Sequence, residues 1–180
     1  MLTREQILNA FEHLASYLDR RNIVGEINLL GGTAMVLAFN ARLATKDVDA
    51  IFAPSAEIRE GAAAVAADLH LPADWLNDAA KGFSSENGTF EELGSASFPG
   101  LRVLAPTAEY LLAMKVMASR VGLDGGRGDV SDIEFLVKRL QLTTPASVMA
   151  IVEEYFDPSR IAPRCYYLVE EIFERLANAD

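Results

Sequence analysis

Apolar residues first recur at helical spacing near the beginning of the chain. Between positions 3 and 20 this stripe consists of Ile7, Phe11, Leu14 and Leu18. Residues three to four positions apart share one face of an α-helix, so the stretch is predicted to be an amphipathic helix. Thr3 and Gln6 match a capping box, in which each side chain bonds the backbone N–H of the other residue. This motif places the start of the helix at Thr3.

Short apolar runs and helical stretches alternate over the next fifty residues. The runs 27–30 and 47–52 are predicted strands, with a short helix between them over about 33–40. Pro54 ends the second strand, and Ser55 is placed to cap an alanine-rich helix that reaches position 69. Glycines and prolines divide residues 71–100 into loops and short strands.

The second half of the chain is predicted to be mainly helical. After a strand over 101–104, Thr107 is placed to cap one helix, and Asp129 caps another behind the glycine-rich loop 122–128. Thr144-Pro145 and Asp157-Pro158 each put a capping residue before a proline at the first helical position, which predicts two more helices. The predicted fold class is therefore α/β (α+β), a small mixed sheet flanked by helices with a helical C-terminal half.

Composition limits the class of protein further. The chain has 180 residues, 51% of them hydrophobic, which is enough for a sizeable core. The single cysteine, Cys165, excludes an internal disulfide, and His13 and His70 are interpreted as structural or surface residues. The chain does not begin with a signal peptide and has no apolar run of membrane-spanning length. A cytoplasmic location without a membrane partner is therefore expected.

The charge of the chain is acidic and uneven. The formal net charge is −10, whereas general nucleic-acid binders usually present a basic surface, so DNA is not expected as a partner. Residues 46–109 contain four basic and eleven acidic residues, and residues 111–139 contain five basic and four acidic ones. A surface that faces phosphate is thus expected nearer the later segment.

One stretch combines two features that suit metal-bound phosphates. Gly31-Gly32 follows a predicted strand and precedes a helix, where backbone N–H groups can bind a phosphate. Asp47 and Asp49 lie one residue apart on the next predicted strand, so both carboxylates share a face and can hold one or two Mg²⁺ ions. Aspartate is disfavoured in strands, which favours a metal site over solvated aspartates on an edge strand.

These residues resemble a known signature. Gly31-Gly32-Thr33-Ala34, followed by Arg42-x-x-Thr45-x-Asp47-x-Asp49, is similar to that of the DNA polymerase β-type nucleotidyltransferase superfamily. Among its branches, the chain most resembles the AbiEii/AbiGii-like and MenT-like toxin nucleotidyltransferases of bacterial toxin–antitoxin and phage-defence systems. Ala113-Met114-Lys115, then Arg120, then Asp129-x-x-Asp132 resemble the later motifs of those proteins.

The resemblance covers about residues 25–140 and implies a role for ten of them. It implies a nucleotidyltransferase-like domain over 1–140, with a helical extension over 141–180 packed on it. Contacts with the nucleotide are implied for Gly31, Gly32, Thr33, Arg42, Lys115 and Arg120. Ligands of Mg²⁺ or Mn²⁺ are implied to be Asp47 and Asp49. Catalytic roles are implied for Asp47, Asp49, Lys115, Asp129 and Asp132.

The chain also departs from the superfamily pattern. Many members carry a third carboxylate on a neighbouring central strand, and the predicted strand 101–104 has none. Glu91 and Glu92 are the substitutes that the sequence offers. Without a third carboxylate, metal binding would be weak or would depend on the phosphates of the substrate.

Several candidate residues have ordinary structural interpretations as well. Lys115 lies beside the apolar stripe of its helix, where a lysine either reaches solvent from the core edge or points into a cleft. Asp129 and Asp132 can be an N-cap and a first-turn acid that the helix dipole favours. The cluster 75–78, Trp-Leu-Asn-Asp, can be a stacking platform, but a packed aromatic residue in an irregular loop is favoured.

The expected function is Mg²⁺-dependent transfer of a nucleoside monophosphate from a nucleoside triphosphate (NTP) to a hydroxyl group. The expected acceptors are RNA, in particular tRNA, or a cognate toxin or antitoxin protein. A net charge of −10 opposes RNA binding unless a local basic patch compensates. The alternatives are a catalytically inactive module of the same fold that binds a nucleotide or a partner, and an antitoxin-type minimal nucleotidyltransferase.

Overall fold

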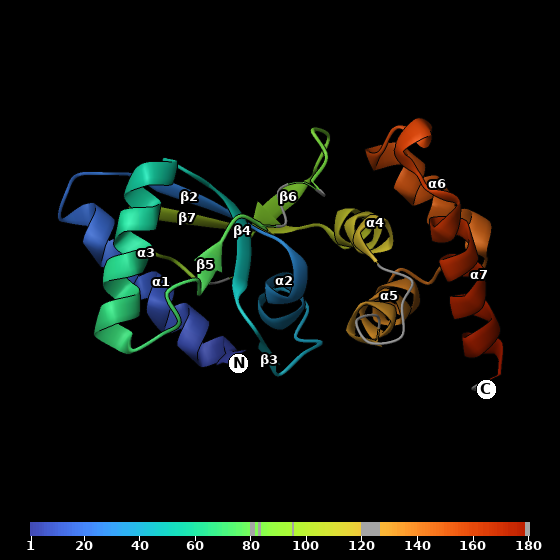
Figure 1. Ribbon diagram of the computed structural model, residues 1–180, viewed down its shortest axis with the longest axis horizontal. Helices are drawn as coiled ribbons and strands as arrows, with labels where there is room; N and C mark the ends of the chain where they lie inside the picture. Colours follow the sequence, from blue (N-terminus) through green and yellow to red (C-terminus); the bar gives the residue numbers. More distant parts are fainter. Residues whose placement is uncertain (80–81, 83, 95, 120–126, 179–180) are drawn as a thin grey trace. The chain divides into compact units, whose positions relative to one another are not determined.

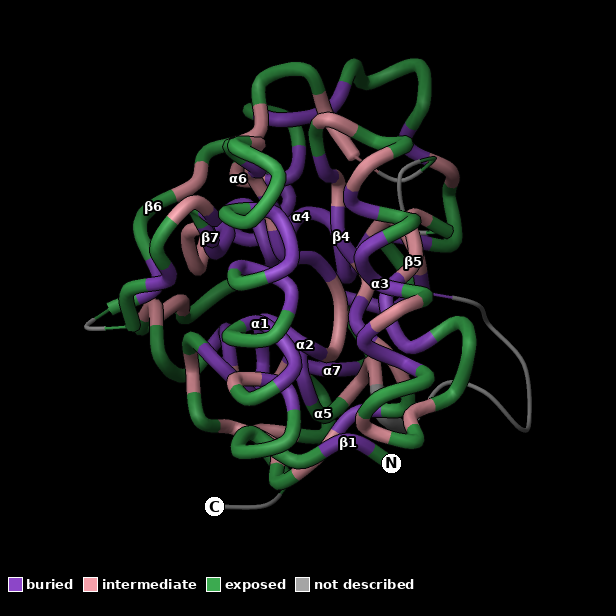
Figure 2. Tube along the Cα trace, turned by 90° about the vertical axis from the view of Figure 1, so that its left-hand side faces the viewer, coloured by how far each residue is buried: buried purple, intermediate pink, exposed green. Residues whose placement is uncertain are grey.

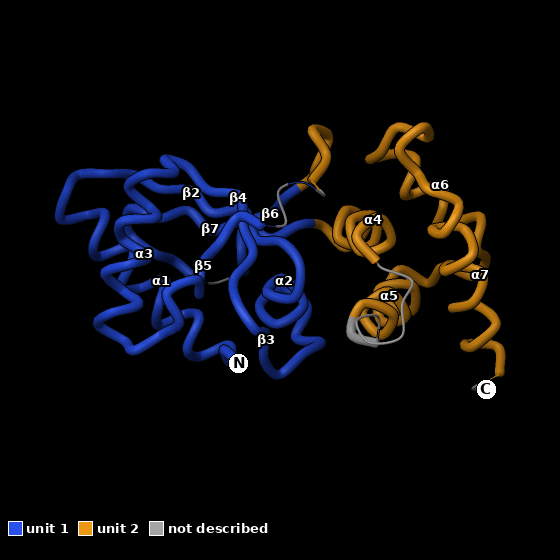
Figure 3. Tube along the Cα trace, viewed as in Figure 1, with its two compact units in different colours: residues 1–82, 90–106 blue, residues 83–89, 107–180 orange. Residues whose placement is uncertain are grey.

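The computed structural model describes residues 1–79, 82, 84–94, 96–119 and 127–178. The chain divides into two compact units, and each is described by itself (Figure 3). Unit 1 comprises Met1–Gly82 and Phe90–Pro106, and unit 2 comprises Phe83–Thr89 and Thr107–Asp180. Residue 140, the predicted end of the first domain, lies within unit 2.

A five-stranded mixed sheet forms the centre of unit 1 (Figure 1). Its strands are β2 (Gly25–Leu29), β4 (Val48–Ala53), β5 (Leu76–Asn77), β6 (Phe90–Glu92) and β7 (Leu101–Pro106). Their order is β5-β4-β2-β7-β6. Strand β2 is antiparallel to β4 and parallel to β7, β5 is parallel to β4, and β6 is antiparallel to β7. The protein is therefore a mixed α and β structure, as expected.

Two helices share a hydrophobic core with one face of this sheet. They are α1 (Arg4–Asp19) and α3 (Ser55–Leu69), which lie side by side in Figure 1. The predicted stripe of α1 is fully buried, each member 0% exposed: Ile7, Phe11, Leu14 and Leu18. The capping box of Thr3 and Gln6 is confirmed. Ser55 does not cap α3, since Pro54 is the N-cap residue and the Ser55 hydroxyl donates to the Phe52 carbonyl.

Helix α2 (Gly31–Leu37) begins and ends earlier than the predicted range 33–40. It follows β2 directly, and its last turn is held by the first residue of α1. The Arg4 Nη1 donates to the carbonyl oxygens of Val36 and Leu37, at 3.1 and 2.7 Å. Carbonyls in the last turn of a helix lack hydrogen-bond donors within the helix, and the Arg4 guanidinium supplies a donor to two of them. Beside α2, β1 (Leu2–Thr3) pairs with β3 (Ala44–Thr45).

Unit 2 is helical in the residues that the structure describes. It contains α4 (Ala108–Ala118), α5 (Arg127–Arg139), α6 (Pro145–Tyr155), a 3-10 turn η2 (Pro158–Arg160) and α7 (Pro163–Ala177). Every residue from Tyr110 to Val116 is buried (purple in Figure 2), because α4 contacts all three other helices. Burial on α7 also raises the pKa of the Cys165 thiol.

Most, but not all, of the predicted caps in unit 2 are observed. Thr107 and Thr144 accept hydrogen bonds from backbone N–H groups three residues ahead, as predicted. Asp157-Pro158 opens only the single turn η2, and α7 begins afresh at Pro163. Because α5 begins at Arg127, Asp129 lies in its first turn instead of at the cap. Among the described helices, none is both long and apolar enough to cross a membrane.

Candidate functional site

The two motifs that the sequence singles out lie together at one end of the sheet in unit 1. Since β2 and β4 are antiparallel, the end of β2 lies beside the beginning of β4, and the Leu30 N–H donates to the Asp49 carbonyl at 2.8 Å. Gly31 has a φ of 54°, and a Cβ there would lie 3.0 Å from Asp49 Oδ2. A Cβ on Gly32 would lie 2.7 Å from Thr45 Oγ1. Both glycines are thus needed where the backbone passes these side chains.

Thr33 and Arg42 border the same turn in different ways. The Thr33 side chain is 0% exposed, and its hydroxyl donates to the Asp47 carbonyl at 3.0 Å. This bond joins α2 to the start of β4 and uses the hydroxyl proton, so the phosphate contact of Thr33 stays a prediction. The half-buried Arg42 places its Nη1 3.6 Å from the position that a Gly32 Cβ would take. Its guanidinium therefore lies next to the Gly31-Gly32 turn.

Both aspartates approach the edge strand β5. Asp49 is the register partner of Asn77, so the two side chains share a face of the sheet. Asp47 is predicted as the first residue of this strand but lies just before β4, and its Oδ2 accepts a hydrogen bond from Asn77 Nδ2 at 3.3 Å. Asp47, Asp49 and Asn77 therefore form one polar cluster, called here the β4–β5 cluster.

The sequence did not single out Asn77, because the strand expected beside the two aspartates was 101–104. In the structure these residues lie in β7, which is separated from β4 by β2. The strand beside β4 is β5, which follows the helix α3. A strand, a helix and a second strand usually place the two strands parallel and adjacent. That pattern, with Asn77-Asp78 after an apolar Trp75-Leu76, was the available signal.

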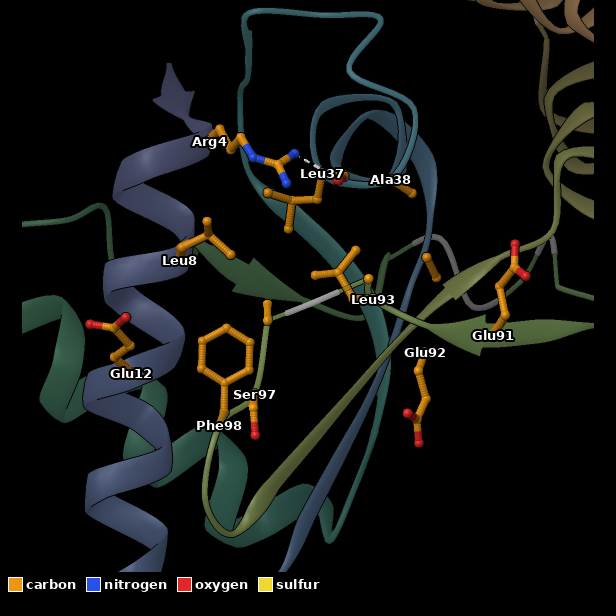
Figure 4. A pocket seen from close by; sticks show the side chains of 13 residues that line it. Arg4, Leu8, Glu12, Leu37, Ala38, Glu91, Glu92, Leu93, Ser97 and Phe98 are labelled. Atoms are coloured by element: carbon orange, nitrogen blue, oxygen red, sulfur yellow. Dashed lines mark hydrogen bonds between the residues drawn. The ribbon is translucent and has the colours of Figure 1, made fainter.

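Glu91 and Glu92 do not replace a third carboxylate. Strand β6 lies three strands away from β4, a distance of about 14 Å at the usual strand spacing. The Glu92 carboxylate is 3.8 Å from Arg102 Nε, and Glu91 points to the opposite side of the strand (Figure 4). The structure therefore rules out both as partners of Asp47 and Asp49.

The β4–β5 cluster fits a hard divalent cation by the chemistry of its donors. Carboxylate oxygens are the ligands that Mg²⁺ and Mn²⁺ favour, and Asp47 and Asp49 are both half-buried. The missing Cβ of Gly31 leaves space beside Asp49 Oδ2 that any other side chain would fill. Within the described residues no group of three or more His, Cys, Asp or Glu could hold a metal ion. Water or a substrate would thus supply the remaining ligands.

Lys115, Asp129 and Asp132 form a second charged cluster, within unit 2. Lys115 Nζ lies 2.9 Å from Asp129 Oδ1 and 2.8 Å from Asp132 Oδ2. The side chains of Lys115 and Asp132 are only 9% and 3% exposed. The ammonium group therefore joins α4 to α5, and its predicted contact with nucleotide phosphates stays a prediction. Arg120 lies outside the described residues.

A groove elsewhere in unit 1 is lined by Glu91 and Glu92 but by none of the residues for which the resemblance implies a role. It has a volume of about 750 Å³ and lies between α1 and the segment that follows β6 (Figure 4). Its apolar lining is already largely buried, with Leu37 3%, Leu93 5% and Phe98 8% exposed. The groove therefore offers little apolar surface to a ligand.

Comparison with protein-family models, with curated proteins and with solved structures finds no significant match to this chain.

Proposed function

We propose that the protein is a Mg²⁺-dependent nucleotidyltransferase that moves a nucleoside monophosphate from an NTP to a hydroxyl group, in a toxin–antitoxin or phage-defence system. One observation carries the proposal. The half-buried residues Asp47 and Asp49 lie at the end of the sheet, where the Gly31-Gly32 turn passes them. A Cβ added to Gly31 would lie only 3.0 Å from Asp49 Oδ2. The sequence signature and this arrangement point to the same chemistry.

The charges of the site define what it can bind. Two carboxylates would repel a triphosphate, so a phosphate can approach them only with a cation between them. Bound Mg²⁺ would neutralise negative charge on the phosphate oxygens as the reaction proceeds. Asp47 and Asp49 would hold the ion, the backbone of Gly31-Gly32 would contact phosphate oxygens, and Arg42 would add positive charge beside them.

The proposed reaction is a substitution at the α-phosphorus. The acceptor hydroxyl forms a new P–O bond and loses its proton, and the bond between the α- and β-phosphates breaks to release pyrophosphate. The net charge of −10 suits a protein hydroxyl as the acceptor at least as well as RNA.

The experiment is label transfer. The protein is incubated with each α-³²P-labelled NTP, Mg²⁺ and either total tRNA or cell lysate, and labelled products are separated on gels. We expect transfer that EDTA abolishes and that Asp49→Asn lowers at least about 100-fold, on the scale of lost electrostatic stabilisation. Asp78→Asn is the matched control, because Asp78 follows β5 but pairs with Arg59 at 2.6 Å. Equal loss in both variants, or transfer that persists in EDTA, would contradict the proposal.

A catalytically inactive module of the same fold is the second candidate. It is favoured by the limit of two carboxylates in the β4–β5 cluster and by the pairing of Lys115 with two aspartates. This candidate predicts saturable NTP binding that depends on Asp49, without transfer of label to any acceptor. Equilibrium binding of the same labelled NTPs separates the two candidates.

A further inference from the structure

Strand β5 is held firmly beside the two aspartates. The Trp75 side chain is 0% exposed, and its indole N–H donates to the Ala62 carbonyl in α3 at 2.9 Å. The Trp75 carbonyl accepts the N–H of Val48 at 2.6 Å, at the start of β4. This tryptophan therefore anchors the two-residue strand on the core side and sets the position of Asn77.

The orientation of the Asn77 amide is set by its two hydrogen bonds. Its Oδ1 accepts the N–H of Ala79 at 2.9 Å, and its Nδ2 donates to Asp47 Oδ2 at 3.3 Å. Turning the amide by 180° would place a donor against the Ala79 N–H and an acceptor against the carboxylate. Only the observed orientation satisfies both neighbours, so the amide presents a donor to Asp47.

The carboxylate of Asp47 depends on this amide. Among the described residues, the only side chain that forms a hydrogen bond or ion pair with the Asp47 carboxylate is that of Asn77. An aspartate that can rotate loses conformational entropy when it binds an ion, whereas one already oriented does not. Partners that orient a ligand in this way commonly change metal affinity about 10–100-fold.

We propose that Asn77 is a positioning residue for the metal site. Its amide holds one oxygen of Asp47 and leaves the other oxygen, with Asp49, to face a divalent cation. The inference rests on the proposed function, because it assumes that the β4–β5 cluster binds such an ion. It assigns a role to the cluster Trp75-Leu76-Asn77-Asp78, for which the sequence favoured a packed loop over a stacking platform.

The test measures binding of Mn²⁺ alone to the full chain. Free Mn²⁺ is followed by electron paramagnetic resonance during titration with MnCl₂, and folding is checked by circular dichroism and thermal unfolding. Asn77→Ala removes the amide, and Asn77→Ser retains a hydroxyl that can accept the Ala79 N–H but is too short to reach Asp47. We expect both to raise the Mn²⁺ Kd about 10–100-fold. Asp78→Asn, which alters only the exposed pair with Arg59, should leave the Kd unchanged.

The outcomes separate this inference from the proposed function. If the wild-type chain has no saturable Mn²⁺ site that Asp49→Asn removes, this inference is wrong, whereas the proposed function is decided by label transfer in the presence of the NTP. If that site exists and Asn77→Ser binds Mn²⁺ as tightly as the wild type, Asn77 has no positioning role while the proposed function survives. If Asn77→Ala does not fold, Asn77→Ser decides, because it preserves the turn at Ala79. A Kd raised equally by Asp78→Asn would also overturn the inference.

Discussion

At the scale of single residues, the glycines of the Gly31-Gly32 turn have two separate reasons to be glycine. The sequence suggests backbone N–H groups that contact phosphate. The structure adds that Gly31 has a φ of 54°. A Cβ added to either glycine would lie within 3.0 Å of an oxygen atom of a neighbouring side chain. A glycine can therefore be required here by packing alone, before any ligand binds.

Gly31→Ala should destabilise unit 1 more than Gly94→Ala does. Both glycines have positive φ, which costs an alanine about 1–2 kcal/mol. Only at Gly31 would the new Cβ also meet a neighbour, Asp49 Oδ2, because nothing lies within 4 Å of a Cβ on Gly94. Trp75 is the single tryptophan of the chain and lies in the core of unit 1, so its fluorescence during urea unfolding reports on this unit. Equal shifts in the two variants would show that the contact with Asp49 does not constrain Gly31.

At the scale of elements, the charged cluster of unit 2 joins two helices. Lys115 on α4 is bound by Asp129 and Asp132 in the first two turns of α5. The sequence suggested that this lysine reaches phosphate, and the structure shows that it already has two anionic partners. Its contribution to stability can be measured without any nucleotide.

Lys115→Met should destabilise unit 2 by about 3–5 kcal/mol, because it removes the ammonium group that contacts the Asp132 carboxylate, which is 3% exposed. Arg175→Met is the control, since the Arg175 side chain is exposed and its pair with Glu134 is expected to contribute about 0–1 kcal/mol. Far-UV circular dichroism during urea unfolding follows the helices of unit 2. A Lys115→Met variant as stable as Arg175→Met, but with weaker NTP binding, would assign the lysine to the nucleotide instead.

At the scale of the whole molecule, the acidic charge of the chain opposes binding to nucleic acid. The chain carries 26 acidic and 16 basic residues. Non-specific binding to nucleic acid is driven by contacts of lysine and arginine with phosphates and weakens as salt rises. An excess of carboxylates opposes this attraction at long range.

We therefore expect no non-specific RNA binding at physiological salt. Fluorescence anisotropy with a labelled single-stranded RNA at 150 mM salt should give a Kd weaker than about 10⁻⁴ M, the weak end of non-specific binding. Titration at low salt shows whether a local basic patch exists. A Kd below about 10⁻⁶ M with a steep salt dependence would favour RNA over a protein as the acceptor.

Several local signals in the sequence, which depend only on neighbouring residues, are confirmed by the structure. The capping box at Thr3, the caps at Thr107 and Thr144, and the buried stripe of α1 are all present. The same reasoning failed at Ser55 and at Asp129, and Asp157-Pro158 caps only the single turn η2. A capping residue marks a place where a helix can begin, but packing decides which of several adjacent starts is used.

The two clusters illustrate the limit of sequence reasoning most directly. The sequence by itself determined the chemistry of the candidate site, since Gly31-Gly32 and the pair Asp47 and Asp49 are close along the chain and lie at consecutive element ends. Only the tertiary structure decided the neighbours: Asn77 beside Asp47, Glu92 three strands away, and Lys115 paired with Asp129 and Asp132. The physical reason is strand order and helix packing, which arise from contacts between distant segments that local periodicity does not encode.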